Sequence, residues 1–156
     1  MKTKHLITIV ALVALIATVI GMSLDARKES NLKKSKAHYQ QALAHQRQGD
    51  RDAATAEFTK AMEKNSGFAL AYYRRGALIT RIKPDQAISD LTRAIALDPG
   101  LSHAYVIRAG TYHRVQEYDK AWDDVHKAES LGIHPDFKSH WKNFVPTLRK
   151  DSGREK

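Results

Sequence analysis

One submotif recurs three times along this chain, and it constrains the fold more than any other feature. Each copy places a small residue, a large apolar residue and a second small residue at positions i, i+4 and i+7. On an α-helix this spacing puts the three side chains on one face, where the small residues let another helix approach closely. The copies begin at positions 54, 87 and 121, so they recur at a nearly constant interval. They are Ala54, Phe58 and Ala61; Ala87, Leu91 and Ala94; and Ala121, Val125 and Ala128.

A second helical segment precedes each triplet, with its own small residue and a turn sequence at its end. The small residues and turns are Ala42 with Gly49-Asp50, Gly76 with Lys83-Pro84-Asp85, and Ala109 with Gln116-Glu117. Each unit is therefore predicted to be helix–turn–helix.

A period of about 34 residues with this pattern resembles the tetratricopeptide repeat family. The resemblance is clearest over residues 71–99. It implies an all-α fold with three repeats, at residues 35–67, 69–101 and 102–135, stacked as a short right-handed solenoid. Three units are about the minimum that buries a continuous core, because each hairpin leaves one apolar face for its neighbour. In the second unit, the interval between Gly76 and Ala87 is one residue shorter than the equivalent interval in the other units. This predicts that its inter-helix turn is tighter or is distorted by Pro84.

The segment after the third unit is predicted to be a capping helix at residues 136–149, followed by a disordered tail at 150–156. Its apolar residues recur at helical spacing and form one stripe. They are Phe137, Trp141, Phe144, Val145 and Leu148. A stripe of this kind also suits partner binding, but covering the bare end of a repeat array is the commoner use.

The amino terminus is predicted to cross a membrane. After a basic leader at residues 1–5, the stretch from Leu6 to Leu24 contains no charged residue, and a charged connector occupies 25–34. This length is enough for a transmembrane helix. A cleaved signal peptide is the alternative, but it has a shorter apolar region and a small-x-small cleavage site. Here the best candidate sites, at residues 19–21 and 21–23, are weak, which favours an uncleaved anchor.

The orientation of this single-pass anchor depends on flanking charge. Lys2 and Lys4 precede it, and five basic residues follow it. The five are Arg27, Lys28, Lys33, Lys34 and Lys36. The short leader resembles export signals and predicts repeats on the extracytoplasmic side, whereas the downstream cluster argues for the opposite side. Cleavage would instead release a secreted or periplasmic domain.

Composition limits the function classes. With 156 residues, the chain has room for an anchor and one domain, and none for an additional enzyme. The absence of cysteine excludes disulfides and thiolate metal sites. The sequence holds no Gly-rich phosphate loop, HExxH or GxSxG motif, and its eight histidines are scattered. We therefore expect no catalytic residues, no cofactor and no metal.

The resemblance implies that ligands lie along the concave face formed by the first helix of each repeat. The positions matched to this groove are Tyr39, Gln40, Leu43 and Arg47 in the first unit, Tyr73, Arg74 and Arg81 in the second, and Val106, His113 and Arg114 in the third.

Three of these residues, Arg47, Arg81 and Arg114, share one repeat position, and Tyr39 and Tyr73 share another. Arginine offers bidentate hydrogen bonds to carboxylates, and tyrosine gives rigid contact area, which suits an extended acidic peptide. The formal net charge of +9 also favours an anionic partner. Alternatively, these arginines form a solvated face or pair with acids inside the domain.

Two other arginines are predicted to be structural. Arg75 and Arg108 share a repeat position, and their units carry Asp90 and Asp124 at matching sites on the second helix. The first unit has Gln41 and Glu57 at these places. Because the arginine and the aspartate are present together in two units and absent together from the first, we expect each arginine to pair with the aspartate of its own unit.

The sequence thus predicts a membrane-tethered scaffold for unidentified protein partners. A subgroup of the family grips chaperone tails with lysine and asparagine at groove positions that here hold Tyr39 and Leu43, so that specificity is not expected. The alternative function is binding of an anionic polymer. Because of the membrane anchor, an envelope polysaccharide suits this alternative better than nucleic acid.

Overall fold

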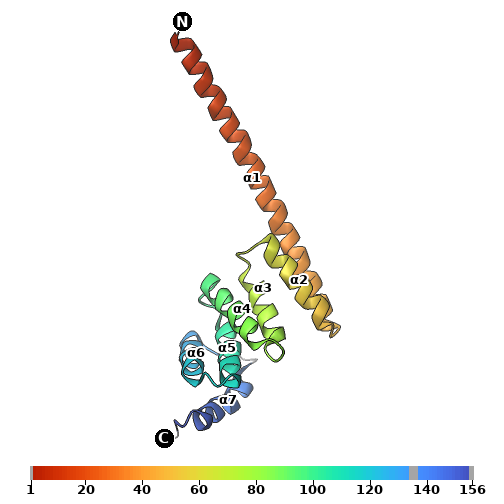
Figure 1. Cartoon of the computed structure of the whole chain (residues 1–156), viewed down its shortest axis with the longest axis vertical. Helices are drawn as coiled ribbons and strands as arrows, with labels where there is room; N and C mark the ends of the chain where they lie inside the picture. The colour runs from red at the N-terminus through yellow and green to blue at the C-terminus, as the bar shows by residue number, and fades with distance from the viewer. Residues whose placement is uncertain (1, 134–136, 155–156) are drawn as a thin grey trace.

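The computed structural model describes residues 2–133 and 137–154, without the side chains of residues 2–11, 13, 14 and 140. In this part of the chain every regular element is an α-helix and no strand occurs, so the all-α prediction is confirmed (Figure 1). The helices are α1 (Lys2–Arg47), α2 (Arg51–Lys64), α3 (Ala69–Ile79), α4 (Pro84–Leu97), α5 (Ser102–Arg114), α6 (Tyr118–Leu131) and α7 (Lys138–Asp151).

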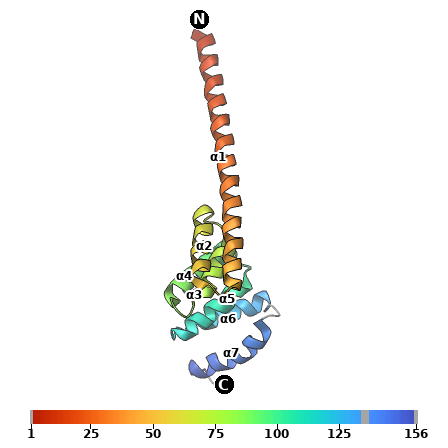
Figure 2. The ribbon, with the colours of Figure 1, turned by 90° about the vertical axis from the view of Figure 1, so that its right-hand side faces the viewer.

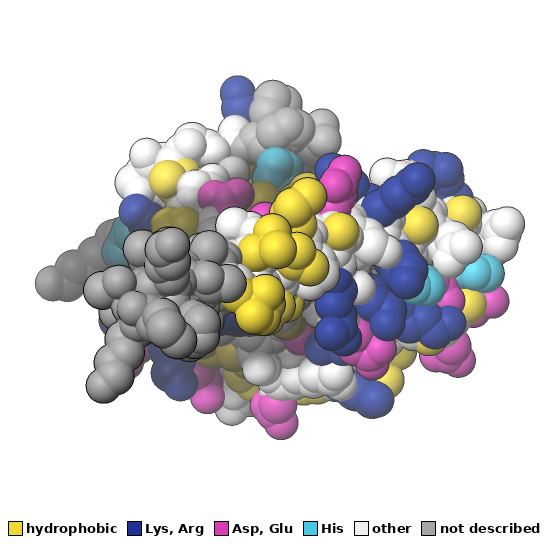
Figure 3. Space-filling view, turned by 90° about the horizontal axis from the view of Figure 1, so that it is seen from above, with side chains coloured by type: hydrophobic (Ala, Val, Ile, Leu, Met, Phe, Trp, Pro, Cys, Tyr) yellow, Lys and Arg dark blue, Asp and Glu magenta, His cyan; other side chains and the backbone are white. Residues whose placement is uncertain are grey.

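The helix α1 is much longer than the others, at 46 residues. Only its carboxy-terminal part lies beside α2, and the remainder projects away from the repeats as a rod (Figures 1 and 2). The charged connector predicted at residues 25–34 is therefore helical and continuous with the first repeat. In the view along this rod, hydrophobic side chains are followed by a dense group of Lys and Arg (Figure 3).

The predicted membrane span at residues 6–24 lies in the projecting part of α1. Among the described residues, the helices include none with the length and apolar character needed to cross a membrane. The side chains of residues 6–11, 13 and 14, which are part of the predicted span, lie outside the described residues.

The repeats stack as three helical hairpins. The pairs α1 with α2, α3 with α4 and α5 with α6 form the hairpins, and α2 and α4 each contact the first helix of the next one. All nine residues of the recurring triplets are completely buried, with exposed fractions of 0%. The small–large–small pattern therefore forms the contact surface between helices, as its spacing predicts.

Gly76 shows how closely two helices approach in the second hairpin. A Cβ atom at this position would lie 3.0 Å from Leu91 Cγ and 3.2 Å from the carbonyl oxygen of Ala87. The other two hairpins accommodate Ala42 and Ala109 at the equivalent place. The glycine thus lets α3 pack against α4 at the point where a larger side chain would separate them.

The turn between α3 and α4 differs from the other two inter-helix turns. Helix α3 ends at Ile79, and α4 begins with Pro84 in its first turn, where the missing N–H of proline costs no hydrogen bond. The backbone N–H groups of Ile82 and Lys83 both donate to the carbonyl oxygen of Ile79. As a result Arg81 lies in the turn, whereas Arg47 and Arg114 are the last residues of their helices.

The helix α7 covers the third hairpin. Trp141 and Leu148, with exposed fractions of 8% and 0%, are buried in one cluster with Trp122 and Val125 of α6. The tail predicted to be disordered from residue 150 is partly structured. Helix α7 extends to Asp151, and Arg154 Nη2 donates to Asp119 Oδ1 at 2.6 Å. The predicted boundary between repeat and cap, at residues 135 and 136, lies outside the described residues.

Candidate functional site

Two arginines connect consecutive hairpins, as the sequence predicts. Arg75 donates two hydrogen bonds to Asp90, at 2.8 and 2.7 Å, and a third to Thr59 Oγ1 on the preceding hairpin at 2.9 Å. Arg108 repeats this arrangement with Asp124, at 2.8 and 2.7 Å, and with Thr92 Oγ1 at 2.8 Å. The predicted internal pairing is confirmed.

The threonine acceptors were not predicted from the sequence. Thr59 and Thr92 are separated by the same interval along the chain as Arg75 and Arg108. A search for polar residues at the repeat period would therefore have found them. Each arginine thus joins its own hairpin to the preceding one.

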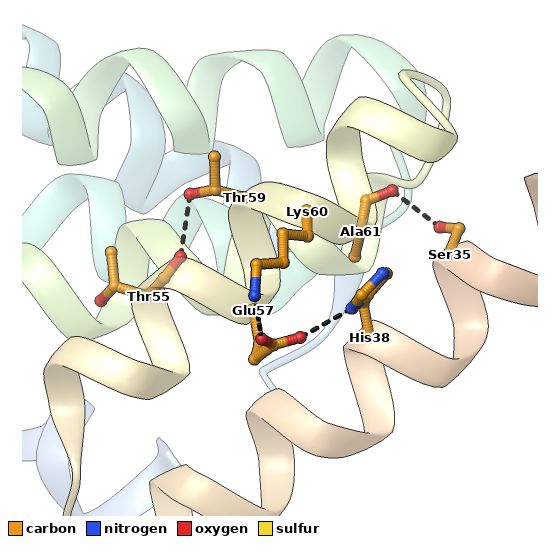
Figure 4. Close-up of polar contacts among 7 residues, drawn as sticks. All are labelled: Ser35, His38, Thr55, Glu57, Thr59, Lys60 and Ala61. Carbon is orange, nitrogen blue, oxygen red and sulfur yellow. Dashed lines mark hydrogen bonds and ion pairs between the residues drawn. The ribbon is translucent and has the colours of Figure 1, made fainter.

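The first hairpin uses a different polar contact, because it lacks the arginine and the aspartate. Glu57 Oε2 lies 2.7 Å from His38 Nδ1 of α1, and Glu57 Oε1 accepts from Lys60 Nζ at 2.6 Å (Figure 4). One helical turn away, Ser35 Oγ donates to the carbonyl oxygen of Ala61 at 2.8 Å. These contacts fix the long helix to α2 at the base of its projecting part.

The Glu57 contacts predict a pH dependence of stability. The hydrogen bond from Lys60 lowers the pKa of Glu57 below its usual 4.5, burial opposes this, and His38 lowers it further. A lowered folded-state pKa stabilises the protein above pH 4.5, and this stabilisation is lost as the pH falls through the folded value. Glu57→Gln should therefore be less stable than the native chain at neutral pH, with a difference that shrinks below pH 4.5.

This difference is measurable by urea unfolding between about pH 7 and pH 3. Glu63→Gln is the matched control, because Glu63 is exposed and makes no hydrogen bond or ion pair with a described residue; it should show no comparable convergence. A constant difference between native and Glu57→Gln chains across this range would contradict the assigned role of the carboxylate.

The three groove arginines, Arg47, Arg81 and Arg114, differ from Arg75 and Arg108 in having no acidic partner among the described residues. Arg47 and Arg81 are exposed and make no hydrogen bond or ion pair with any described residue. Arg114 is also exposed, and its Nη1 donates to the carbonyl oxygen of Thr80 at 3.0 Å, across the boundary between two hairpins. The guanidinium of Arg114 is thereby held next to the turn that carries Arg81.

The predicted aromatic residues of the groove are mostly buried. Tyr39 and Tyr73 have exposed fractions of 9% and 8%, and Val106 has 4%. The Tyr39 ring centroid lies 4.9 Å from that of Phe68, and burial raises the pKa of Tyr73. Packing therefore leaves little of these three side chains for a ligand to touch.

Other predicted groove residues remain on or near the surface. Gln40 is exposed, Leu43 is half-buried, and the guanidinium of Arg74 lies 5.5 Å from the centroid of the Tyr73 ring. The Nε atom of Arg74 is buried without a hydrogen-bond partner among the described residues. Of the predicted groove residues, Gln40 and the three arginines at the shared repeat position are thus exposed, whereas the two tyrosines are buried.

A surface hollow of about 480 Å³ lies where α5 meets the cap. His113 is central to it: its Nε2 atom lies 2.7 Å from Asp151 Oδ2, and its ring is 5.6 Å from that of Phe144. The hollow is lined by Gly110, His113, Arg114, Gln116, Tyr118, Phe144 and Asp151. Asp151 and Phe144 were not predicted here, because no sequence pattern shows where the cap docks.

Metal and cofactor sites were not expected from the sequence. Among the side chains that the structure describes, no group of three or more His, Cys, Asp or Glu is arranged to hold a metal ion.

Comparison with known proteins shows relatives of the same repeat class. No model of a protein family matches the chain. Hsc70-interacting protein 1 of Drosophila melanogaster is 28% identical over 100 residues, which cover 64% of this chain and 26% of that protein. The chain therefore corresponds to about a quarter of that relative's length.

Solved structures resemble the chain over more of its length. The Arabidopsis OM64 TPR domain has a TM-score of 0.70 and 26% identity, and covers 77% of this chain and 98% of its own. The first TPR of Spaghetti (RPAP3), bound to the HSP90 peptide SRMEEVD, has a TM-score of 0.67 and 21% identity. The match covers 75% of this chain and 94% of that one. The stacked hairpins and these likenesses show a tetratricopeptide repeat fold, and the resemblance in the sequence is confirmed.

Proposed function

We propose that this chain is a membrane-tethered scaffold whose concave face binds an extended acidic segment of partner proteins. The contacts to the segment come from Arg47, Arg81 and Arg114. Arg47 and Arg114 end the first helices of their hairpins, and Arg81 lies two residues after the end of α3. The fold supports the coarser part of this proposal, since its structural neighbours include tetratricopeptide repeat domains bound to peptides. One of those peptides, SRMEEVD, is itself acidic.

The observation that carries the proposal is the division of the arginines into two groups. Arg75 and Arg108 are satisfied by aspartates inside the domain, and their side chains are 14% exposed. The three groove arginines are exposed, and none of them pairs with a carboxylate of a described residue. Unpaired guanidinium groups at one repeat position can each make bidentate contacts to carboxylates of a bound segment.

The membrane tether rests on the sequence of the projecting part of α1. Residues 6–24 are uncharged and long enough to span a bilayer as a single helix. The rod-like projection of α1 would then hold the repeats clear of the bilayer surface. We propose a single-pass topology with the repeats on the extracytoplasmic side.

The proposal is tested by affinity capture from a membrane-solubilised lysate. The bait is the full chain in detergent, beside an Arg47→Glu, Arg81→Glu, Arg114→Glu variant of unchanged helicity. We expect defined proteins to bind the native chain and to be lost from the variant, because each reversal replaces attraction to an acidic segment with repulsion.

A matched control reverses three exposed basic residues on the second helices or the cap, namely Arg93, Lys127 and Lys142. This control changes the net charge equally and should retain the partners. Equal capture by all three baits would contradict the groove assignment. Capture of polyanions alone, without sequence preference and with steep salt dependence, would favour polymer binding instead.

A further inference from the structure

A second basic site lies at the point where α1 leaves the repeat domain. Helix α2 ends at Lys64, three residues after Ala61, whose carbonyl oxygen accepts from Ser35 of α1. Beyond the end of α2, no described helix packs on the projecting part of α1 (Figures 1 and 2). A hollow of about 400 Å³ occupies the step between the two helices. It is lined by Leu24, Arg27, Lys28, Asn31, Leu32, Lys64 and Asn65.

The hollow has the composition of an anion site. Three of its lining residues are cations, two are amides that can donate hydrogen bonds, and none is acidic. Arg27, Lys28 and Lys64 are exposed, and none of them makes a hydrogen bond or ion pair with any residue that the structure describes. Asp25 and Glu29 belong to the same helix but do not line the hollow. Three unpaired positive charges therefore face one cavity, supplied by two different helices.

The hollow also has apolar side chains at both ends of its α1 wall. Leu24, next to the uncharged stretch, and Leu32, toward the repeats, have exposed fractions of 58% and 41%, which is high for large apolar side chains. Leu24 is the last residue of the uncharged stretch that begins at Leu6. Figure 3 shows the same succession, with hydrophobic side chains on α1 followed by the dark-blue group of Lys and Arg. An occupant of the hollow would thus meet cations beside an apolar surface.

We infer that this hollow binds the phosphate headgroup of an anionic phospholipid in the bilayer that α1 enters. The inference rests on the proposed membrane tether and adds a ligand to it. Arg27, Lys28 and Lys64 surround the phosphate, Asn31 and Asn65 donate to its oxygens, and Leu24 contacts the first part of an acyl chain. Basic side chains next to a membrane-spanning segment attract anionic lipids in this way. The site would fix the height and rotation of the repeats relative to the membrane surface.

The cations of the hollow are separable from the general charge of α1. Lys33, Lys34 and Lys36 lie on the same helix and are exposed, but they do not line the hollow. The test variant is Arg27→Gln, Lys28→Gln, Lys64→Gln, and the matched control is Lys33→Gln, Lys34→Gln, Lys36→Gln. Both remove three positive charges and use a residue with good helix propensity.

Lipid binding is measured by titrating the full chain in non-ionic detergent with a short-chain phosphatidylglycerol, a short-chain phosphatidylcholine and glycerol phosphate. The chain has no cysteine, so a fluorophore can be attached at Ser66→Cys alone, next to Asn65 of the hollow. We expect the native chain and the control to prefer phosphatidylglycerol to phosphatidylcholine. The hollow variant should bind phosphatidylglycerol at least about tenfold more weakly.

Several results would overturn the inference. Equal weakening in both variants would show diffuse attraction without a built site, and equal affinity for the two phospholipids would exclude charge recognition. Binding of glycerol phosphate as tightly as of phosphatidylglycerol would identify a soluble phosphate ligand in place of a lipid. Alkaline carbonate extraction of native membranes tests the tether separately. Release of the chain by carbonate would overturn the tether, whereas retention with an unselective hollow would overturn the lipid site alone.

Discussion

Replacing Asp124 with alanine is expected to lower the free energy of unfolding by about 3–5 kcal/mol, because the substitution leaves a buried guanidinium without its counter-charge. The side chain of Asp124 is 5% exposed and that of Arg108 is 14% exposed. Arg108 would also lose the two hydrogen bonds that join α5 to α6 within the third hairpin, and would keep only the one to Thr92 of the second hairpin. Urea unfolding followed by circular dichroism measures the loss.

The adjacent Asp123 provides the control, because it is exposed and Asp123→Ala should change stability by no more than about 0.5 kcal/mol. Burial raises the pKa of Asp124 although Arg108 opposes the shift, so burying this carboxylate has a desolvation cost that an apolar side chain at the same place would not have. We therefore expect the double variant Arg108→Met, Asp124→Leu to recover much of the stability that Asp124→Ala loses. A mild effect of Asp124→Ala would contradict the structural role of the pair.

Phe58→Ala should destabilise the first hairpin by about 3–5 kcal/mol. Phe58 is completely buried between α1 and α2, and the centroid of its ring lies 5.6 Å from that of Tyr39. Its removal leaves a cavity in the cluster that joins the long helix to the repeats. The exposed Ile82 is the control, since Ile82→Ala removes apolar atoms that are 63% exposed and should have a small effect.

The two tryptophans make this loss measurable by position as well as by size. Trp122 and Trp141 both lie in the cluster around the third hairpin and the cap, at the opposite end of the array from Phe58. In a repeat array that contacts only its neighbours, the first hairpin can lose structure before the last. Phe58→Ala is thus expected to lower the circular dichroism midpoint more than the tryptophan fluorescence midpoint. Identical shifts of both midpoints would indicate that the array unfolds as one unit.

The features predictable from sequence were those that depend on local helical geometry. The triplets of Ala54, Phe58 and Ala61 and their equivalents follow from spacing on a single helix face, and all are buried. The Arg75 and Arg108 pairs were predictable because arginine and aspartate appear together in two repeats and are absent together from the first. Because each pattern occurs in more than one repeat, its second occurrence supports the prediction made from the first.

The features that were not predictable depend on how neighbouring segments pack. Tyr39 and Tyr73 occupy groove positions, but the ring of Phe68 covers one and that of His103 lies 6.1 Å from the other. His113 is held by Asp151, which reaches it only because α7 docks against the third hairpin. The hollow beside Leu24 forms because α2 ends before the projecting part of α1 does. Each of these contacts joins residues whose separation follows no repeat.

The most direct test of the account is site-specific photo-crosslinking of the full chain in native membranes. A photoreactive amino acid replaces Gln40, an exposed groove position on α1, in one variant and Arg93, an exposed position on α4, in the other. Crosslinking of a defined protein from position 40, and its loss after Arg47→Glu, Arg81→Glu, Arg114→Glu, is the predicted result. Crosslinking of partners from position 93 and none from position 40 would contradict the concave face as the binding site.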